Sequence, residues 1–159
     1  MKVCFLCGYL TGRWSLVKRV DYEDGGTWRG EARFDGRRLT ESGRFYFDRD
    51  PATGLELNAK PQTFRFDDDR VDVSWDDGGP FYSFDPKALP EVSFTPHYCG
   101  PDVYRGELAI IDGDRFDVRW KVSGSKQGTI HQHFRRIHQV DEQKEPDGQP
   151  DSQSVARRA

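Results

Sequence analysis

The sequence predicts an all-β fold, a single antiparallel up-and-down β-barrel of about ten strands, preceded by a short N-terminal arm or helix. Between residues 12 and 137, short segments of alternating or aromatic-rich sequence follow one another, separated by clusters of Gly, Asp and Pro. Several of these clusters contain Asp next to Gly, which is typical of tight turns between antiparallel neighbours. Closing such a meander into a barrel, rather than a sandwich, removes the exposed sheet edges.

Ten strands are expected between Trp14 and Ile137. They are Trp14–Asp21, Trp28–Phe34, Leu39–Phe47, Thr63–Phe66, Val71–Trp75, Phe81–Phe84, Val92–Tyr98, Tyr104–Ile111, Arg115–Val122 and Thr129–Ile137. The connections at residues 23–26, 76–79 and 112–114 supply glycines for positive φ and aspartates that bond nearby backbone, so sequence neighbours should pair. Apolar residues alternate with charged or small ones, as at Phe116 and Trp120, which places one face of each strand inside the barrel.

The two ends of the chain differ from the barrel. Lys2–Leu10 has no clear period of two, so we expect a short helix or arm that covers one barrel mouth. Residues 139–159 contain no aromatic residue and cannot offset the entropy cost of ordering by burying apolar surface. We therefore expect one domain, residues 1–138, followed by a disordered tail, residues 139–159.

Composition limits the classes of partner. The formal net charge is −3, with acidic and basic residues interspersed, so the sequence has no long basic tract for binding nucleic acid. The longest nearly apolar stretch, Val3–Leu10, is too short to span a membrane and lacks a signal-peptide cleavage pattern. The cysteines are Cys4, Cys7 and Cys99, an odd number too small for a disulfide framework, which favours free thiols and a cytoplasmic location.

The opening of the first strand, Gly12-Arg13-Trp14, resembles the Gly-x-Trp signature of lipocalin-like, or calycin, barrels. In that superfamily the Trp closes one barrel end beneath an Arg of the last strand. The resemblance implies a structural role for Trp14 and Arg135, with Arg136 as the alternative. A guanidinium stacked on an indole gains cation–π attraction and seals the end of the barrel.

A second pattern runs from His97 to Gly106 and reads His-x-Cys-x-x-Asp-x-Tyr-x-Gly. Together with the segments Gly30-x-Ala32-x-Phe34 and Trp120-x-Val122-x-Gly124, it resembles a family of uncharacterised single-domain calycin-like proteins, a domain of unknown function. The resemblance implies a lipocalin-like β-barrel over the ordered domain and implies no activity.

The same pattern gathers residues that are capable of binding. His97 and Cys99 share one face of the expected strand, and Asp102 and Tyr104 follow a Gly-Pro turn. If that face points inward, these residues line a cavity at the barrel rim; if it points outward, they are edge and turn residues. We predict a ligand-binding site from them and from Arg44, because a buried arginine needs a carboxylate partner or an anionic ligand.

Metal binding is an alternative for the thiols and imidazoles. Cys4 and Cys7 form a Cys-x-x-Cys motif which, with His97 and Cys99, would supply the four ligands of a structural zinc site. The motif lies in an apolar run, however, where both cysteines serve equally well as core packing. We therefore expect neither a metal nor a cofactor.

His131 and His133 also share a face of the last expected strand, at a spacing that suits a metal or an axial haem ligand. Their neighbours do not form an apolar face that would turn them inward, so we expect an exposed pair.

The leading functional hypothesis is a barrel that binds a small amphipathic or anionic molecule in an aromatic-lined cavity, because barrels of this size enclose space for a ligand. We expect a binding protein rather than an enzyme. The alternatives are a small enzyme that uses His97 and Cys99 at the barrel mouth, and a non-catalytic interaction module with a packed interior. These three hypotheses differ in whether the strand face that carries His97 points into a cavity, toward solvent or into a packed core.

Overall fold

The computed structural model describes residues 2–138, with side chains from Phe5 onward. Residues 139–159, the expected tail, lie outside the described residues. The elements, in chain order, are α1 (Lys2–Leu10), β1 (Gly12–Asp21), β2 (Gly26–Phe34), β3 (Arg38–Phe47), β4 (Asp50–Glu56), β5 (Gln62–Phe66), β6 (Val71–Trp75), β7 (Pro80–Phe84), a 3-10 turn (Pro86–Ala88), β8 (Glu91–Ser93), β9 (His97–Cys99), β10 (Asp102–Asp112), β11 (Arg115–Ser123) and β12 (Gly128–Arg136).

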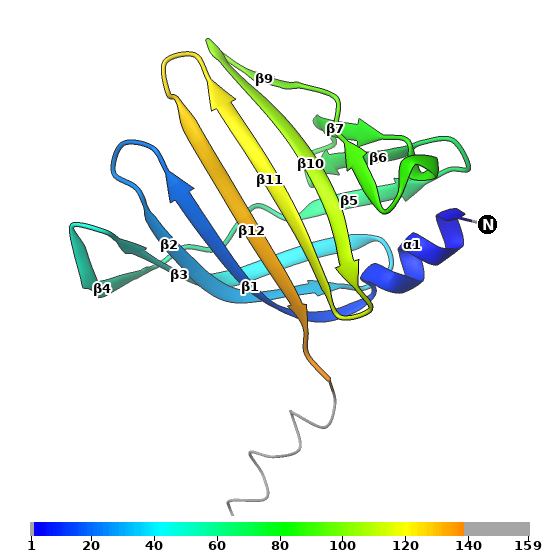
Figure 1. The fold of residues 1–159 in the computed structure, drawn as a ribbon, viewed down its shortest axis with the longest axis horizontal. Coiled ribbons are helices and arrows are strands. Elements are labelled where there is room, and N and C mark those ends of the chain that lie inside the picture. The colour runs from blue at the N-terminus through cyan, green and yellow to red at the C-terminus, as the bar shows by residue number, and fades with distance from the viewer. Residues whose placement is uncertain (1, 139–159) are drawn as a thin grey trace, which may run out of the picture.

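The strands form one strongly curved antiparallel sheet (Figure 1). Its order is β7-β6-β5-β3-β2-β1-β12-β11-β10-β8, with β4 added to β3 and β9 added to β10. The edges meet where Thr95, just after β8, donates its backbone N–H to the Ser83 carbonyl of β7 over 2.9 Å. The predicted all-β, nearly closed antiparallel barrel with one short N-terminal helix is confirmed.

Two strand assignments differ from the prediction. The sequence does not predict β4, because its Pro and Gly break the alternation of apolar and polar residues. β4 pairs only with the second half of β3, and most of its residues are exposed to solvent. The expected strand Val92–Tyr98 is divided into β8 and β9, with Pro96 lacking the N–H that a continuous ladder needs. At this break Thr95 turns from β10 toward β7, so the interruption brings the two sheet edges together.

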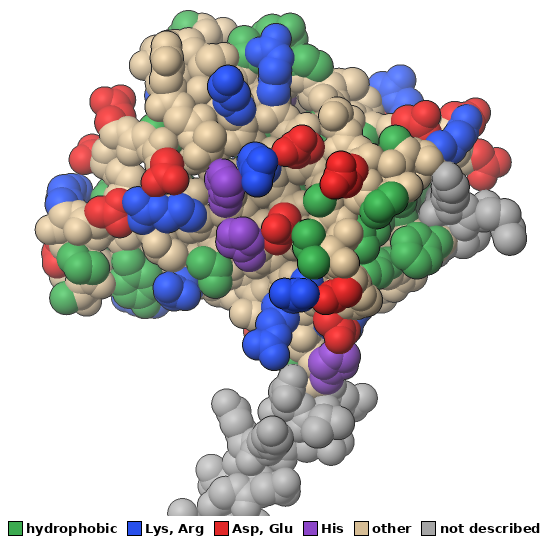
Figure 2. All heavy atoms as spheres, viewed as in Figure 1, with side chains coloured by type: hydrophobic (Ala, Val, Ile, Leu, Met, Phe, Trp, Pro, Cys, Tyr) green, Lys and Arg blue, Asp and Glu red, His purple; other side chains and the backbone are tan. Residues whose placement is uncertain are grey.

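The barrel interior follows the predicted alternation. On β11 the inward residues are all nearly inaccessible to solvent: Phe116, Val118, Trp120 and Val122. The outward residues between them are charged, and Figure 2 shows cationic, anionic and histidine side chains mixed over this face of the sheet. The sequence period of two therefore separates a largely aromatic core from a solvated surface.

Helix α1 covers one end of the barrel, beside the start of β1 and the end of β12 (Figure 1). It buries Leu6, Tyr9 and Leu10 in the main core cluster. The N-terminal segment is thus the helix that the prediction offered as one of two alternatives. Within residues 2–138, no helix is long and apolar enough to cross a membrane.

Candidate ligand-binding cavity

The barrel encloses a cavity of about 240 Å³. Ten of the residues that line it are aromatic, and they come from strands throughout the sheet. These aromatic residues are Trp14, Phe34, Phe64, Trp75, Phe81, Tyr82, Tyr104, Phe116, Trp120 and Phe134. A wall of this kind removes apolar ligand surface from water and favours flat molecules that stack on the rings.

A stack of three rings forms one wall. Phe81 lies between Trp75 and Trp120, with ring centroids 4.2 Å and 5.3 Å away and nearly parallel planes. A shift of register between β6 and β7 at Val73 places an extra residue on β7. As a result Phe81 and the adjacent Tyr82 both contact Trp120, although alternation alone would send one of them outward.

Two glycines let the large indoles lie flat against the barrel wall. A Cβ on Gly106 would lie 2.6 Å from the Trp120 ring, and a Cβ on Gly30 would lie 2.6 Å from the Trp28 ring. The rings therefore occupy the space that a side chain at Gly106 or Gly30 would need. Gly106 is the last residue of the His97–Gly106 pattern, and this close approach explains its place there.

An ion pair lies inside this aromatic cavity. Lys18 of β1 reaches across β2 and donates a hydrogen bond from Nζ to Oε1 of Glu41 on β3. The side chains are 16% and 5% exposed, respectively. Lys18 Nζ also lies 4.7 Å above the Trp28 ring, a cation–π contact that helps to hold the ammonium inside the barrel.

Further polar groups surround the pair. Gln132 of β12 is the register partner of Lys18 and lines the cavity. Burial raises the pKa of Tyr82, and the negative charge of Glu41 raises it further. The Tyr82 phenol therefore stays protonated at neutral pH and can donate a hydrogen bond.

Lys60 lies at the edge of the cavity and is exposed to solvent. Its Nζ is 5.5 Å from the Trp75 ring centroid and 3.7 Å from a carboxylate oxygen of Asp77. The segment just before Lys60 is held against the barrel wall, because Trp28 Nε1 donates a hydrogen bond to the Leu57 carbonyl over 2.6 Å. The cavity thus has a solvent-exposed ion pair, Lys60 with Asp77, at its rim and a largely buried ion pair, Lys18 with Glu41, within.

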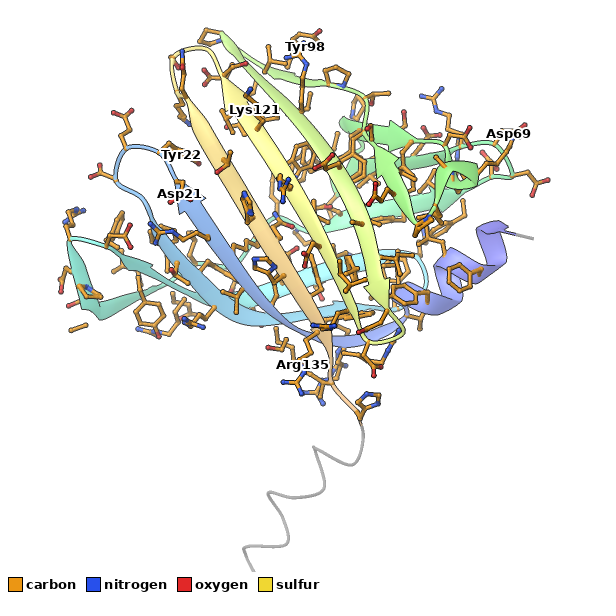
Figure 3. All side chains as sticks on the ribbon, in the orientation of Figure 1. Asp21, Tyr22, Asp69, Tyr98, Lys121 and Arg135 are labelled. Atoms are coloured by element: carbon orange, nitrogen blue, oxygen red, sulfur yellow. The ribbon has the colours of Figure 1, made fainter. Side chains whose placement is uncertain are left out.

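The structure separates the predicted pair His97 and Cys99. His97 is half-buried, with its ring edge-on to Phe81 at 4.9 Å and 6.0 Å from the Tyr104 ring. It lines a groove of about 1070 Å³ that shares Phe64, Phe81 and Tyr82 with the aromatic cavity, but His97 does not line the cavity itself. Cys99 is exposed, and Tyr98 between them projects away from the barrel (Figure 3).

The remaining predicted binding residues also fall in different places. Buried Asp102 accepts hydrogen bonds from the Ser125 N–H at 2.7 Å and the Ser125 hydroxyl at 2.8 Å, which lower its pKa and fix the turn after β11. Tyr104 lines the cavity. The prediction that Arg44 is a buried binding residue is wrong. Arg44 lies on the outer face of β3, is exposed, and donates to the Gly54 carbonyl over 2.7 Å.

No cluster of three or more His, Cys, Asp or Glu side chains in the described part of the chain could hold a metal ion. Cys7 lies on α1, with Sγ 3.4 Å from the Gly36 carbonyl, whereas Cys99 lies beside the opposite end of β10. The Cys4 side chain is outside the described residues. His131 and His133 lie on the outer face of β12, where His133 contacts Asp117 at 3.0 Å.

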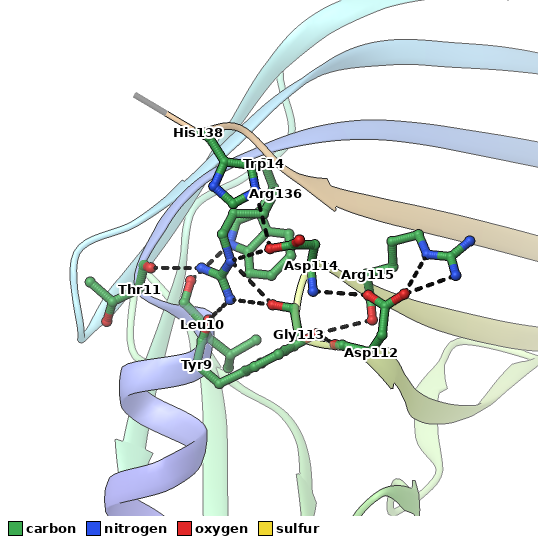
Figure 4. Close-up of polar contacts among 10 residues, drawn as sticks. All are labelled: Tyr9, Leu10, Thr11, Trp14, Asp112, Gly113, Asp114, Arg115, Arg136 and His138. Carbon is green, nitrogen blue, oxygen red and sulfur yellow. Dashed lines mark hydrogen bonds and ion pairs between the residues drawn. The ribbon is translucent and has the colours of Figure 1, made fainter. Parts of the chain in front are cut away.

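At the closed end, Arg136 rather than Arg135 stacks on Trp14 (Figure 4). Its guanidinium carbon is 4.3 Å from the indole centroid, and Nη2 donates to the Tyr9 carbonyl at 2.8 Å and the Gly113 carbonyl at 3.1 Å. Trp14 and Arg136 are register partners and share the inner face. Arg135, one residue away, points outward and is exposed (Figure 3).

These contacts predict unequal roles for the two arginines. Arg136→Met should lower the free energy of unfolding by roughly 2 kcal/mol, because the helix-end and hairpin carbonyls lose charged donors. The matched variant Arg135→Met should change it by less than about 0.5 kcal/mol. Urea unfolding of both variants measures the difference, and equal losses would contradict the structural role of Arg136.

Sequence reasoning missed the central pair of the cavity. Lys18 and Glu41 are in phase with buried neighbours, since Trp14 and Leu16 precede Lys18 on the same face and Leu39 precedes Glu41. That phase was the signal that could have found them.

The fold resembles solved structures at low sequence identity. The S-type phycobiliprotein lyase CPES from Guillardia theta superimposes with a TM-score of 0.60 at 6% identity, covering 87% of this chain and 94% of that chain. A DUF3598 family protein of unknown function from Nostoc punctiforme superimposes with a TM-score of 0.54 at 13% identity, over 82% of this chain and 49% of that chain. This chain therefore spans about half of the second protein.

Among curated proteins, none matches the sequence significantly. The family model described as "Family of unknown function (DUF6314)" matches residues 10–136, which run from the end of α1 to the end of β12. The chain belongs to this family.

Proposed function

We propose that the barrel binds a small amphipathic molecule in its aromatic cavity. The observation that carries the proposal is the cavity of about 240 Å³, in which aromatic walls surround a small number of polar groups. Concave, mostly apolar sites with a few convergent polar groups are typical of small-molecule binding. The Trp75–Phe81–Trp120 stack would hold a flat apolar part of the ligand.

The rim favours an amphipathic ligand over a pure hydrocarbon. Lys60 places a solvent-exposed ammonium beside the Trp75 ring, where it can contact a polar or anionic group of a ligand that extends out of the cavity. The phycobiliprotein lyase is a barrel of related fold. Because the identity is low, this similarity supports only the architecture, including the lipocalin-like character that we propose. The proposed class of ligand rests on the cavity of this chain.

The alternatives have less support. A packed interaction module is hard to reconcile with the cavity. An enzyme centred on His97 and Cys99 would need the imidazole, the thiol and the Asp102 carboxylate to cooperate, but Cys99 is exposed and Asp102 is engaged with Ser125.

Filling the cavity tests the proposal. Val118 lines the cavity, and Val118→Phe should weaken binding of the solvatochromic naphthalene probe prodan at least about tenfold by occupying its space. Val17 lies on the outer face of β1, so the matched variant Val17→Phe should leave binding unchanged. The blue shift of prodan emission during titration measures the affinity. Failure of the wild-type protein to bind prodan, or equal binding by both variants, would overturn the proposal.

A further inference from the structure

The Lys18–Glu41 pair leaves hydrogen-bonding capacity open to the cavity. Lys18 has three ammonium hydrogens and gives one to Glu41 Oε1, and Oε2 of Glu41 has no partner among the described residues. Among the described residues, every side-chain oxygen or nitrogen that is inaccessible to solvent has a hydrogen-bond partner. Glu41 is 7% exposed and lines the cavity, so its second oxygen must reach the cavity space.

Other polar groups of the cavity wall are also available for hydrogen bonding. The Tyr82 hydroxyl has no hydrogen-bond partner among residues 2–138, so it too must be accessible to solvent. Tyr82 lines the cavity, close enough for the charge of Glu41 to raise its pKa. Gln132, beside Lys18, adds an amide that both donates and accepts. The interior therefore presents donors and acceptors together, next to rings that can hold an apolar body.

The charges within the cavity cancel. A ligand carboxylate that approaches Lys18 also comes close to the negative charge of Glu41, because the two side chains are hydrogen-bonded to each other. A ligand ammonium that approaches Glu41 meets Lys18 in the same way. An ionic group would lose its hydration on entry without net electrostatic compensation. An uncharged group loses less hydration and can use both partners.

We propose that the Lys18–Glu41 pair selects ligands whose buried end is uncharged and carries a donor and an acceptor side by side, as a carboxamide or lactam does. The N–H of such a group donates to Glu41 Oε2, and its carbonyl accepts from Lys18 Nζ. This inference rests on the proposed binding function, and it assigns any anionic group of the ligand to the rim near Lys60 instead of to the interior.

Three naphthalene derivatives that differ only in the substituent test the selection by displacing prodan. From the wild-type protein, 2-naphthamide should displace prodan at a concentration at least about tenfold lower than 2-naphthoate or 2-methylnaphthalene. In the double variant Lys18→Met/Glu41→Leu the preference for the amide should disappear, and 2-methylnaphthalene should bind best. The outer-face double variant Arg19→Met/Asp48→Leu removes an exposed ion pair and should keep the wild-type order.

The outcomes separate the two proposals. Prodan binding with equal displacement by all three compounds, or stronger displacement by 2-naphthoate, would overturn the selection by Lys18 and Glu41 and leave the binding function standing. Retention of the amide preference in the Lys18→Met/Glu41→Leu protein would also overturn the selection. Absence of prodan binding by the wild-type protein would overturn the binding function and, with it, this inference.

Discussion

Trp14→Ala is expected to lower the free energy of unfolding by about 3 to 5 kcal/mol. The Trp14 side chain is 1% exposed. Its ring centroid lies 5.6 Å from that of Tyr9, 4.8 Å from that of Phe116 and 4.3 Å from the guanidinium carbon of Arg136. Nε1 donates to the Leu10 carbonyl at 2.8 Å, which ties the end of α1 to β1. The truncation therefore removes packing from the helix, the sheet and the arginine at once.

The comparison with a second tryptophan isolates this effect. Trp75 is half-buried at the cavity rim, so Trp75→Ala should cost clearly less than Trp14→Ala in the same urea titration. Because Trp14→Ala can bring a marginally stable domain close to unfolding, Trp14→Phe serves as a milder variant. It keeps most of the ring contacts, loses the Leu10 hydrogen bond and should cost about 1 to 2 kcal/mol. A Trp14→Ala loss no larger than that of Trp75→Ala would contradict the role of Trp14 in closing the barrel.

The sequence carried enough information for the barrel because strand alternation and turn chemistry are local. The inner face of β11, from Phe116 to Val122, could be predicted from a period of two alone. The hairpin at residues 112–114 could be predicted from Asp and Gly alone. Both features depend on residues that are close together along the chain, so they do not require knowledge of the register between strands.

The closed end required that register. Arg135 and Arg136 are adjacent, and which of them faces Trp14 depends on the offset between β1 and β12, chain segments more than a hundred residues apart. A shift of one residue exchanges the inner and outer faces of a strand. The sequence therefore narrowed the choice to two arginines and could not distinguish them.

The cavity was predicted less completely, because its polar groups depend on contacts between strands. Lys18 and Glu41 come from β1 and β3, and Lys18 reaches its partner across β2. Considered separately, each charged residue is expected in solvent. His97 and Cys99 both lie on β9, but His97 lines the neighbouring groove and Cys99 is exposed, so neither residue lines the aromatic cavity.

Glu41→Leu is expected to lower the free energy of unfolding by roughly 3 kcal/mol, because it leaves the Lys18 ammonium inside the barrel without its carboxylate. The double variant Lys18→Met/Glu41→Leu replaces both charges with apolar groups of similar length and should differ from the wild-type protein by less than about 1 kcal/mol. Urea unfolding of the single and double variants measures both values at one pH. If the double variant is as unstable as Glu41→Leu, the pair is needed for folding; if it recovers, the barrel tolerates an apolar interior. Recovery would mean that the ion pair contributes little net stability, which is the result expected of groups whose purpose is to meet a ligand.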